Sequence, residues 1–172
     1  TYTFNLTPSG QGLVTADIAA GAGQDAAGNT NTAAPQFSRT YDTVPPTVTM
    51  TSAAPNPTNA SPIPVTVTFS EAVAGFTAAK ITATNGTVSG FAGAGTTYTF
   101  NLTPTGQGLV TADIAAGAAQ DSAGNGNTAA PQFSRTYDSI APTVASIVLS
   151  GASPTSAAGL SADSVGGVEL FR

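Results

Sequence analysis

The sequence predicts an all-β fold, an antiparallel Greek-key sandwich, on two observations. Short runs of alternating apolar and polar residues recur along the chain, and Gly, Pro or Asn separates them, as in strands joined by turns. The sequence also repeats itself, because residues 1–48 align without gaps on residues 97–144 with 41 of the 48 positions identical. This period of 96 residues is too long for one coil of a solenoid and suits one sandwich domain of about 100 residues.

Seven strands are expected in the full repeat. A short turn at residues 76–79 interrupts the strand pattern, and Asn85 with Gly86 is a strong signal for a two-residue hairpin. The opening stretch "TYTFNLTP", residues 1–8, reads as a strand and recurs at 97–104. The expected strands of the full repeat are 48–52, 63–70, 81–84, 87–91, 97–103, 109–115 and 132–137.

The last of these strands carries a charged residue on its apolar face. In "QFSRTYD", Phe133, Arg135 and Tyr137 share one side of the strand. Arg135 therefore lies either at the rim, with its stem buried and its head in water, or at a β-bulge that re-aims it.

The composition excludes several classes of function. Nine acidic residues against four basic ones give a net charge of −5, which argues against a nucleic-acid partner and suits a divalent cation. The chain has no Cys and no His, which removes disulfides, zinc sites and the usual nucleophile–base pairs, so we expect no enzyme. No apolar run approaches the roughly 18 residues that span a bilayer, so we expect no membrane insertion.

Several short elements of the repeat together point to a known family. With "FSEAV", "TNGTVSGF", "DSAGN" and "D-x-x-(A/P)-P-T", the unit resembles the bacterial immunoglobulin-like (BIg) tandem repeats of very large secreted or surface-anchored adhesins. The resemblance covers the whole unit and both partial flanks, and Lys80 departs from it where an acid is expected. It implies an immunoglobulin-like sandwich, an extracellular or cell-surface location, and an extender role in which copies in series project a terminal binding domain.

The repeat divides the chain into three expected segments. Residues 1–44 are the last three strands of one immunoglobulin-like repeat, 45–140 a complete repeat, and 141–172 the start of a further repeat with a divergent tail. Three strands cannot bury both core faces, so neither flank should fold alone. Either the chain is a window cut from a longer array, or strands of one molecule complete the next in a head-to-tail filament. The partners are then neighbouring repeats of the same chain or adjacent subunits.

The few acidic residues fall where immunoglobulin topology would join two repeats. Asp42 ends the last strand of the preceding repeat, Glu71 closes a strand in "FSEAV", and Asp121 opens the loop "DSAGNGN". The topology brings these carboxylates to one junction, with Asn125 or Asn127 as further candidate ligands. Three close carboxylates repel one another unless a cation neutralises them. Calcium suits hard oxygen ligands on irregular loops.

Calcium is thus the one cofactor that the sequence predicts. By resemblance, calcium between adhesin repeats stiffens the rod, and Asp138 would face the next junction. The alternative is ordinary turn chemistry without an ion, in which Asp and Asn cap turns, Gly supplies positive φ, and Glu71 is merely solvated.

Two classes of function remain open at this point. The leading hypothesis is a structural extender segment without catalysis. The other is a module that binds a ligand or carbohydrate through its loops, which the absence of Trp makes weaker, because sugar sites usually offer stacking aromatic rings.

Overall fold

A computed structural model describes residues 1–144 of the chain. All the strands below belong to the unit Thr1–Ser139. The expected further repeat and its divergent tail fall almost entirely in residues 145–172, outside the described residues. Within residues 1–144, no helix is long and apolar enough to cross a membrane.

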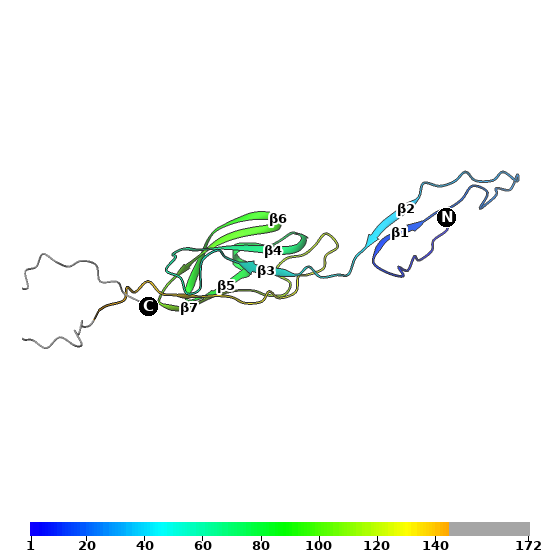
Figure 1. Ribbon diagram of the computed structural model, residues 1–172. Coiled ribbons are helices and arrows are strands. Elements are labelled where there is room, and N and C mark those ends of the chain that lie inside the picture. The colour runs from blue at the N-terminus through cyan, green and yellow to red at the C-terminus, as the bar shows by residue number, and fades with distance from the viewer. Residues whose placement is uncertain (145–172) are drawn as a thin grey trace, which may run out of the picture. The chain divides into compact units, whose positions relative to one another are not determined.

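The predicted antiparallel sandwich is confirmed, and it is built from two sheets (Figure 1). The first sheet contains, in spatial order, β3 (Val48–Thr51), β4 (Ile63–Val73) and β6 (Gly86–Pro104). The second sheet contains β5 (Ile81–Thr84), β7 (Gly108–Ile114) and β8 (Phe133–Tyr137). A single 3-10 turn, η1 (Ala78–Lys80), precedes β5 near the expected short turn.

The long strand β6 doubles back on itself, as Figure 1 shows. Gly93 and Gly95, at the reversal, have φ angles of 120° and 67°, which side-chain-bearing residues rarely adopt. A Cβ on Gly93 would lie 2.6 Å from the Cα of Tyr98, so only glycine permits this close approach of the two halves. The two expected strands at 87–91 and 97–103 are therefore both present, as the halves of β6.

The core lies between the inward faces of the two sheets. The antiparallel register of β4 and β6 sets Val65 opposite Phe100, and both side chains are at most 2% exposed. Burying a large apolar side chain stabilises the fold by about 1.5–3 kcal/mol, so the alternate residues of these strands supply much of the stability. The buried apolar residues of β4 and the second half of β6 are Ile63, Val65, Val67, Phe69, Val73, Tyr98, Phe100 and Leu102.

The expected hairpin at Asn85 and Gly86 is wrong. The two strands that flank these residues lie in different sheets, because β5 pairs with β7 and β6 pairs with β4. Asn85 does adopt the left-handed conformation, with φ 53°, and its Nδ2 donates to the carbonyl oxygens of Gly106 and Leu109 at 3.1 and 3.2 Å. Asn85 thus has the left-handed conformation of a turn residue, but the chain crosses here from one sheet to the other.

The expected strand at residues 1–8 is also wrong, so one of the three strands expected in the first segment does not form. Among the described residues, this segment has only two strands, β1 (Gly12–Ala16) and β2 (Phe37–Tyr41), which pair with each other in an antiparallel sheet. The same eight residues at 97–104 belong to β6 and pair with β4. No strand of this kind pairs with residues 1–8 in the described part of the chain, so their backbone groups have no ladder to join.

Arg135 does not lie at a bulge, because β7 and β8 pair without a register shift. Its guanidinium lies over the Phe133 ring, 4.8 Å from the ring centre. The Nε and Nη2 atoms donate to the carbonyl oxygens of Ala54 and Ser52 at 3.1 and 3.2 Å. Through these half-buried hydrogen bonds, Arg135 connects the second sheet to the loop that follows β3 of the first sheet.

Candidate metal centre

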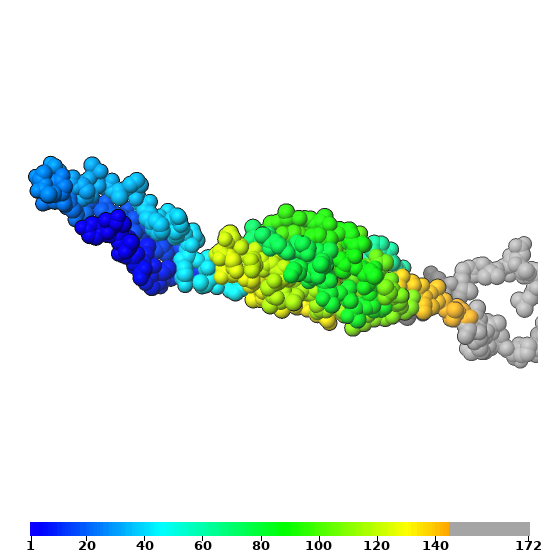
Figure 2. All heavy atoms as spheres, turned by 180° about the vertical axis from the view of Figure 1, so that it is seen from behind, coloured from blue at the N-terminus to red at the C-terminus, as the bar shows by residue number. Residues whose placement is uncertain are grey.

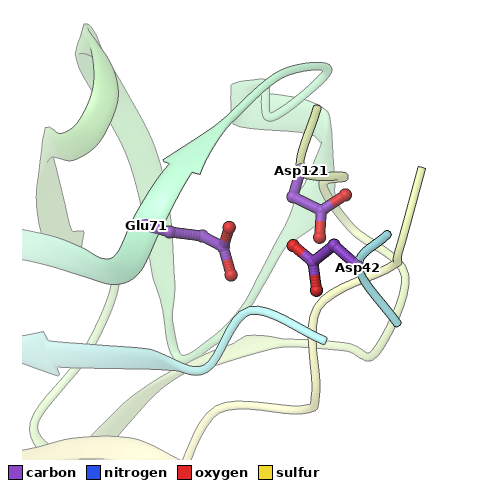
Figure 3. A group of neighbouring side chains, drawn as sticks. All are labelled: Asp42, Glu71 and Asp121. Atoms are coloured by element: carbon purple, nitrogen blue, oxygen red, sulfur yellow. The ribbon is translucent and has the colours of Figure 1, made fainter. Parts of the chain in front are cut away.

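Three carboxylates from separate parts of the chain meet at one place (Figure 3). Asp42 lies ahead of β3, Glu71 lies in β4, and Asp121 lies in the loop between β7 and β8. One oxygen from each lies within 4.8 Å of the other two, and Figure 3 shows the side chain of Glu71 directed towards the two aspartates. These are three of the residues that the sequence places at a junction.

The segment that carries Asp42 is fixed to the sandwich by backbone hydrogen bonds. Pro46 is fully buried, and its carbonyl oxygen accepts the N–H of Thr128 at 2.9 Å. The N–H of Thr47 donates to Oγ of Ser70 at 2.9 Å, and the N–H of Ser70 donates back to the Thr47 carbonyl at 2.9 Å. These contacts hold the linker beside the part of β4 in which Glu71 lies.

Glu71 lies in the part of β4 where pairing with β6 becomes irregular. The register shifts between Thr68 and Val73, and an irregularity of this kind re-aims the side chains of the strand. Glu71 is half-buried, and burial raises the pKa of its carboxyl, with a further increase from the negative charges of Asp121 and Asp42. Burial and the two neighbouring aspartates therefore disfavour the ionised form of Glu71.

Asp121 is held in a fixed orientation by its own loop. Its Oδ1 accepts the backbone N–H groups of Ala123 and Asn125 at 2.8 and 2.9 Å, and its Oδ2 accepts Nδ2 of Asn125 at 2.8 Å. Burial would raise the pKa of Asp121, but hydrogen bonds from Asn125, Ala123 and Gly124 together lower it. Asp121 is thus a preoriented carboxylate that stays ionised at neutral pH.

Asn125 joins the cluster as a hydrogen-bond donor. Besides Asp121, its Nδ2 reaches the backbone carbonyl oxygen of Asp42 at 3.2 Å. The sequence marked Asn125 as a candidate ligand, and in the structure the amide nitrogen of its side chain connects the loop to the linker.

Asn127, the other candidate amide, is used inside its loop. It is 2% exposed, its Oδ1 accepts the N–H of Ala119 at 2.7 Å, and its Nδ2 donates to the carbonyl oxygens of Ala115 and Thr128 at 3.1 and 2.7 Å. The spacing of polar residues in "DSAGNGN" could not distinguish this internal role from a ligand role.

Asp138 does not belong to the three-carboxylate group. It follows β8, and its backbone N–H donates to the carbonyl oxygen of Thr58 at 2.9 Å. Its assignment to the next junction stays a prediction.

A second copy of the loop shows which part of the geometry is local. Asp25 accepts the N–H groups of Ala27 and Asn29 at 2.9 Å each, and Nδ2 of Asn29 donates to its Oδ2 at 2.9 Å. Hydrogen bonds from Asn29 lower the pKa of Asp25, as in the other copy. The loop therefore forms without a carboxylate cluster around it, so the cluster depends on the additional presence of Asp42 and Glu71.

The donor set determines which ions the centre can accept. All three candidate ligands are carboxylate oxygens, which are the ligands that calcium prefers, and irregular loop geometry suits its variable coordination. Among residues 1–144, the sequence supplies no His or Cys that would favour zinc or a thiolate metal. The residues present thus fit a calcium ion.

The comparison with protein families assigns most of this architecture. Residues 42–137 match the model of a family described as the bacterial Ig-like domain. The matched range begins at Asp42 and includes Glu71, Asp121 and every strand of the sandwich. No curated protein and no solved structure matches the chain.

Proposed function

Because the chain belongs to the bacterial Ig-like domain family, we propose that it is an extender, or stalk, segment of a bacterial cell-surface or secreted adhesin. The family supports a structural module, and Ig-like domains of this kind are generally non-catalytic. The near-identity of residues 1–48 and 97–144 supports an arrangement of such modules in series. The partners are then neighbouring Ig-like repeats, in the same chain or in adjacent subunits, and the location is extracellular.

One observation carries the mechanical part of this proposal. The carboxylate of Asp42 comes from the segment that leads into the sandwich, whereas Glu71 and Asp121 come from the sandwich itself. A calcium ion held by these three residues would neutralise their mutual repulsion and connect the linker to the domain. An extender needs such connections, because a free linker between domains allows them to move independently.

Asp121 and Glu71 would contribute to calcium binding in different ways. Asp121 is oriented in advance by Asn125 and Ala123, so little ordering is required when a cation arrives. Glu71 has a raised pKa, and its charge is the least favourable one without a cation. We propose that bound calcium offsets the repulsion between Glu71 and the two aspartates. The linker is then held most firmly when calcium is present.

Calorimetry and thermal unfolding of the full chain test the calcium site. We expect saturable heat on calcium addition, a higher melting temperature in calcium than in EDTA, and slower amide hydrogen exchange at residues 42–47, because a ligand that binds only the native state stabilises it. Asp121→Asn should remove all three effects. Asp17→Asn is the matched control, because Asp17 is exposed and bonds to Gln36 outside the cluster, and it should retain them. Absence of both heat and a melting shift in the unmodified chain contradicts the calcium site.

A further inference from the structure

The linker that leads into the sandwich begins with a residue that is bonded to the segment before it. Thr43 follows the end of β2, and the side chain of Gln11, just ahead of β1, contacts it twice. Oε1 of Gln11 accepts the backbone N–H of Thr43 at 3.0 Å, and Nε2 of Gln11 donates to Oγ1 of Thr43. The pairing of β1 with β2 ends at Gly12 and Tyr41. The glutamine side chain therefore extends the connection beyond the backbone ladder and into the linker.

The same contact occurs after the last strand of the sandwich. Oε1 of Gln107 accepts the backbone N–H of Ser139 at 3.1 Å, and Nε2 of Gln107 donates to Oγ of Ser139 at 2.7 Å. The linker sequence differs between the copies, with Thr-Val-Pro at 43–45 and Ser-Ile-Ala at 139–141. Both copies nevertheless have a hydroxyl at the first position, and this hydroxyl accepts from the glutamine. The contact is thus retained while the linker around it changes.

Every backbone N–H of residues 43–47 has an acceptor within the protein. The N–H of Val44 donates to Oδ1 of Asp42 at 2.9 Å, and the N–H of Thr47 has its partner in β4. The two prolines between them carry no N–H. Proline also fixes its own φ angle and restricts the residue before it to extended conformations. The middle of the linker therefore has few conformations available to it.

The far end of the linker belongs to the sandwich. The carbonyl oxygen of Pro46 accepts the N–H of Thr128 at 2.9 Å, and Thr47 exchanges hydrogen bonds with Ser70. Figure 2 shows the linker, in cyan, against the yellow segment that joins β7 to β8. The linker is thus held at both ends by groups of the protein alone.

We propose that Gln11 and Gln107 are positioning residues of the linkers: each bonds the first linker residue to the strands before it, and Gln11 thereby keeps residues 43–47 ordered without a cation. The consequence for a stalk rests on the function proposed above, because calcium would then bind beside a linker that is already ordered. A linker with fixed prolines and satisfied N–H groups has little conformational entropy left to lose when two modules are aligned.

NMR relaxation of the isotopically labelled full chain in EDTA tests this role of Gln11. In the unmodified chain, we expect backbone order parameters of about 0.85 at Thr43 and Val44, the value of rigid backbone. Gln11→Ala should lower both, with Thr43 below about 0.6. It should also speed amide hydrogen exchange at Thr43 about fivefold, because that N–H loses its hydrogen bond. The melting temperature of the sandwich should not change, since Gln11 lies outside the sandwich.

Gln36→Ala is the matched control. Gln36 belongs to the same segment, but its side chain bonds to the carboxylate of Asp17 at 3.0 and 3.1 Å, outside the linker. Thr43→Ser should keep the linker ordered, because Ser139 makes the same contact in the second copy. Thr43→Val should have an intermediate effect, because it removes only the hydroxyl. Equal loss of order in Gln36→Ala and Gln11→Ala overturns the proposal.

Gln107→Ala provides a test that does not depend on the folding of the first segment. Gln107 lies just ahead of β7 in the complete sandwich, so amide hydrogen exchange at Ser139 should become faster. The paired amides of β7 and β8 should keep their protection. Unchanged exchange at Ser139 overturns the proposal, whatever happens at Thr43.

Repeating the relaxation measurement in calcium separates this role from the proposed calcium site. Order at Thr43 and Val44 that is already present in EDTA supports the glutamine contact, and absence of calcium-dependent heat would then contradict only the calcium site. Order that develops only after calcium is added overturns the proposal and leaves the calcium site standing.

Discussion

The chain contains the same eight residues twice, and the two copies have different structures. At 97–104 they lie within β6, and Phe100 is 2% exposed, whereas at 1–8 they form no strand, and Phe4 is 69% exposed. The local sequence is identical, so neither strand propensity nor the alternation of side chains explains the difference. The difference lies in β4, which pairs with one copy and not with the other.

Other repeated parts of the chain behave alike in both copies. β1 pairs with β2 in the same register in which β7 pairs with β8, with Gly12 opposite Tyr41 and Gly108 opposite Tyr137. The two Asp–Asn loops also have the same hydrogen bonds. Segments whose partners are close in the sequence thus form in both settings, whereas the repeated stretch forms a strand at 97–104, where β4 pairs with it, and none at 1–8, where no described strand does.

The largest expected effect comes from the paired phenylalanines. Phe100→Ala should destabilise the sandwich by about 3–5 kcal/mol, because it removes a buried ring and leaves a cavity. Phe4→Ala removes the same ring from an exposed position and should change the stability by less than about 0.5 kcal/mol. Urea unfolding of the two full-length variants measures both, and equal effects would mean that residues 1–8 are packed in solution.

A second pair of residues, Asn31 and Asn127, extends the comparison to the two Asp–Asn loops. Asn127 and Asn31 make the same three kinds of hydrogen bond, each to one backbone N–H and two backbone carbonyl oxygens. Asn127 is 2% exposed, so Asn127→Ala leaves buried groups without partners and should cost about 1–3 kcal/mol.

Asn31 makes its bonds at exposed positions, where water replaces a lost partner, so Asn31→Ala should cost less than about 0.5 kcal/mol. Thermal unfolding of each variant, with hydrogen exchange of its own loop, distinguishes the two sites. A large cost at Asn31 would show that the first loop is as buried in solution as the second.

The sequence predicted most of the fold because its strands alternate and its repeat fixes the domain length. It failed at Asn85, where the turn signal describes φ angles and says nothing of which sheet receives the next strand. It failed again at residues 1–8, because an alternating pattern specifies a face and not the presence of a partner.

The candidate site was predictable in part for the same reason. Immunoglobulin topology places the ends of particular strands together, which is enough to bring Asp42, Glu71 and Asp121 to one place. The roles of Asn125 and Asn127 depend on which atom of each amide faces which carbonyl oxygen. Such detail is set by the folded loop, and residue type alone does not contain it.

The smallest expected effect concerns the charge of Glu71, which lies beside the carboxylate of Asp121 in one Asp–Asn loop and has no such place in the Asp25 loop. Glu71 has a pKa raised by burial and by Asp121 and Asp42, so its ionised form opposes folding at neutral pH. In EDTA at pH 7, Glu71→Gln should therefore raise the melting temperature slightly. The gain should shrink as the pH falls through the folded pKa of Glu71, because the native carboxyl then takes up a proton and loses its charge as well.

The pKa of Asp121 is shifted in the opposite direction, downwards, and the Asp25 loop provides the control. The lowered pKa of Asp121 means that its charge stabilises the fold above the unfolded pKa, and this stabilisation is lost as the pH falls through the folded value. Asp121→Asn in EDTA should therefore lower the melting temperature at pH 7 and lose its effect in acid. Hydrogen exchange in the Asp25 loop should not respond to Glu71→Gln, because Asp42, Glu71 and Asp121 form their cluster without Asp25. If Glu71→Gln lowers the melting temperature in EDTA, the carboxylates do not repel one another, and the cation is not needed to hold the linker.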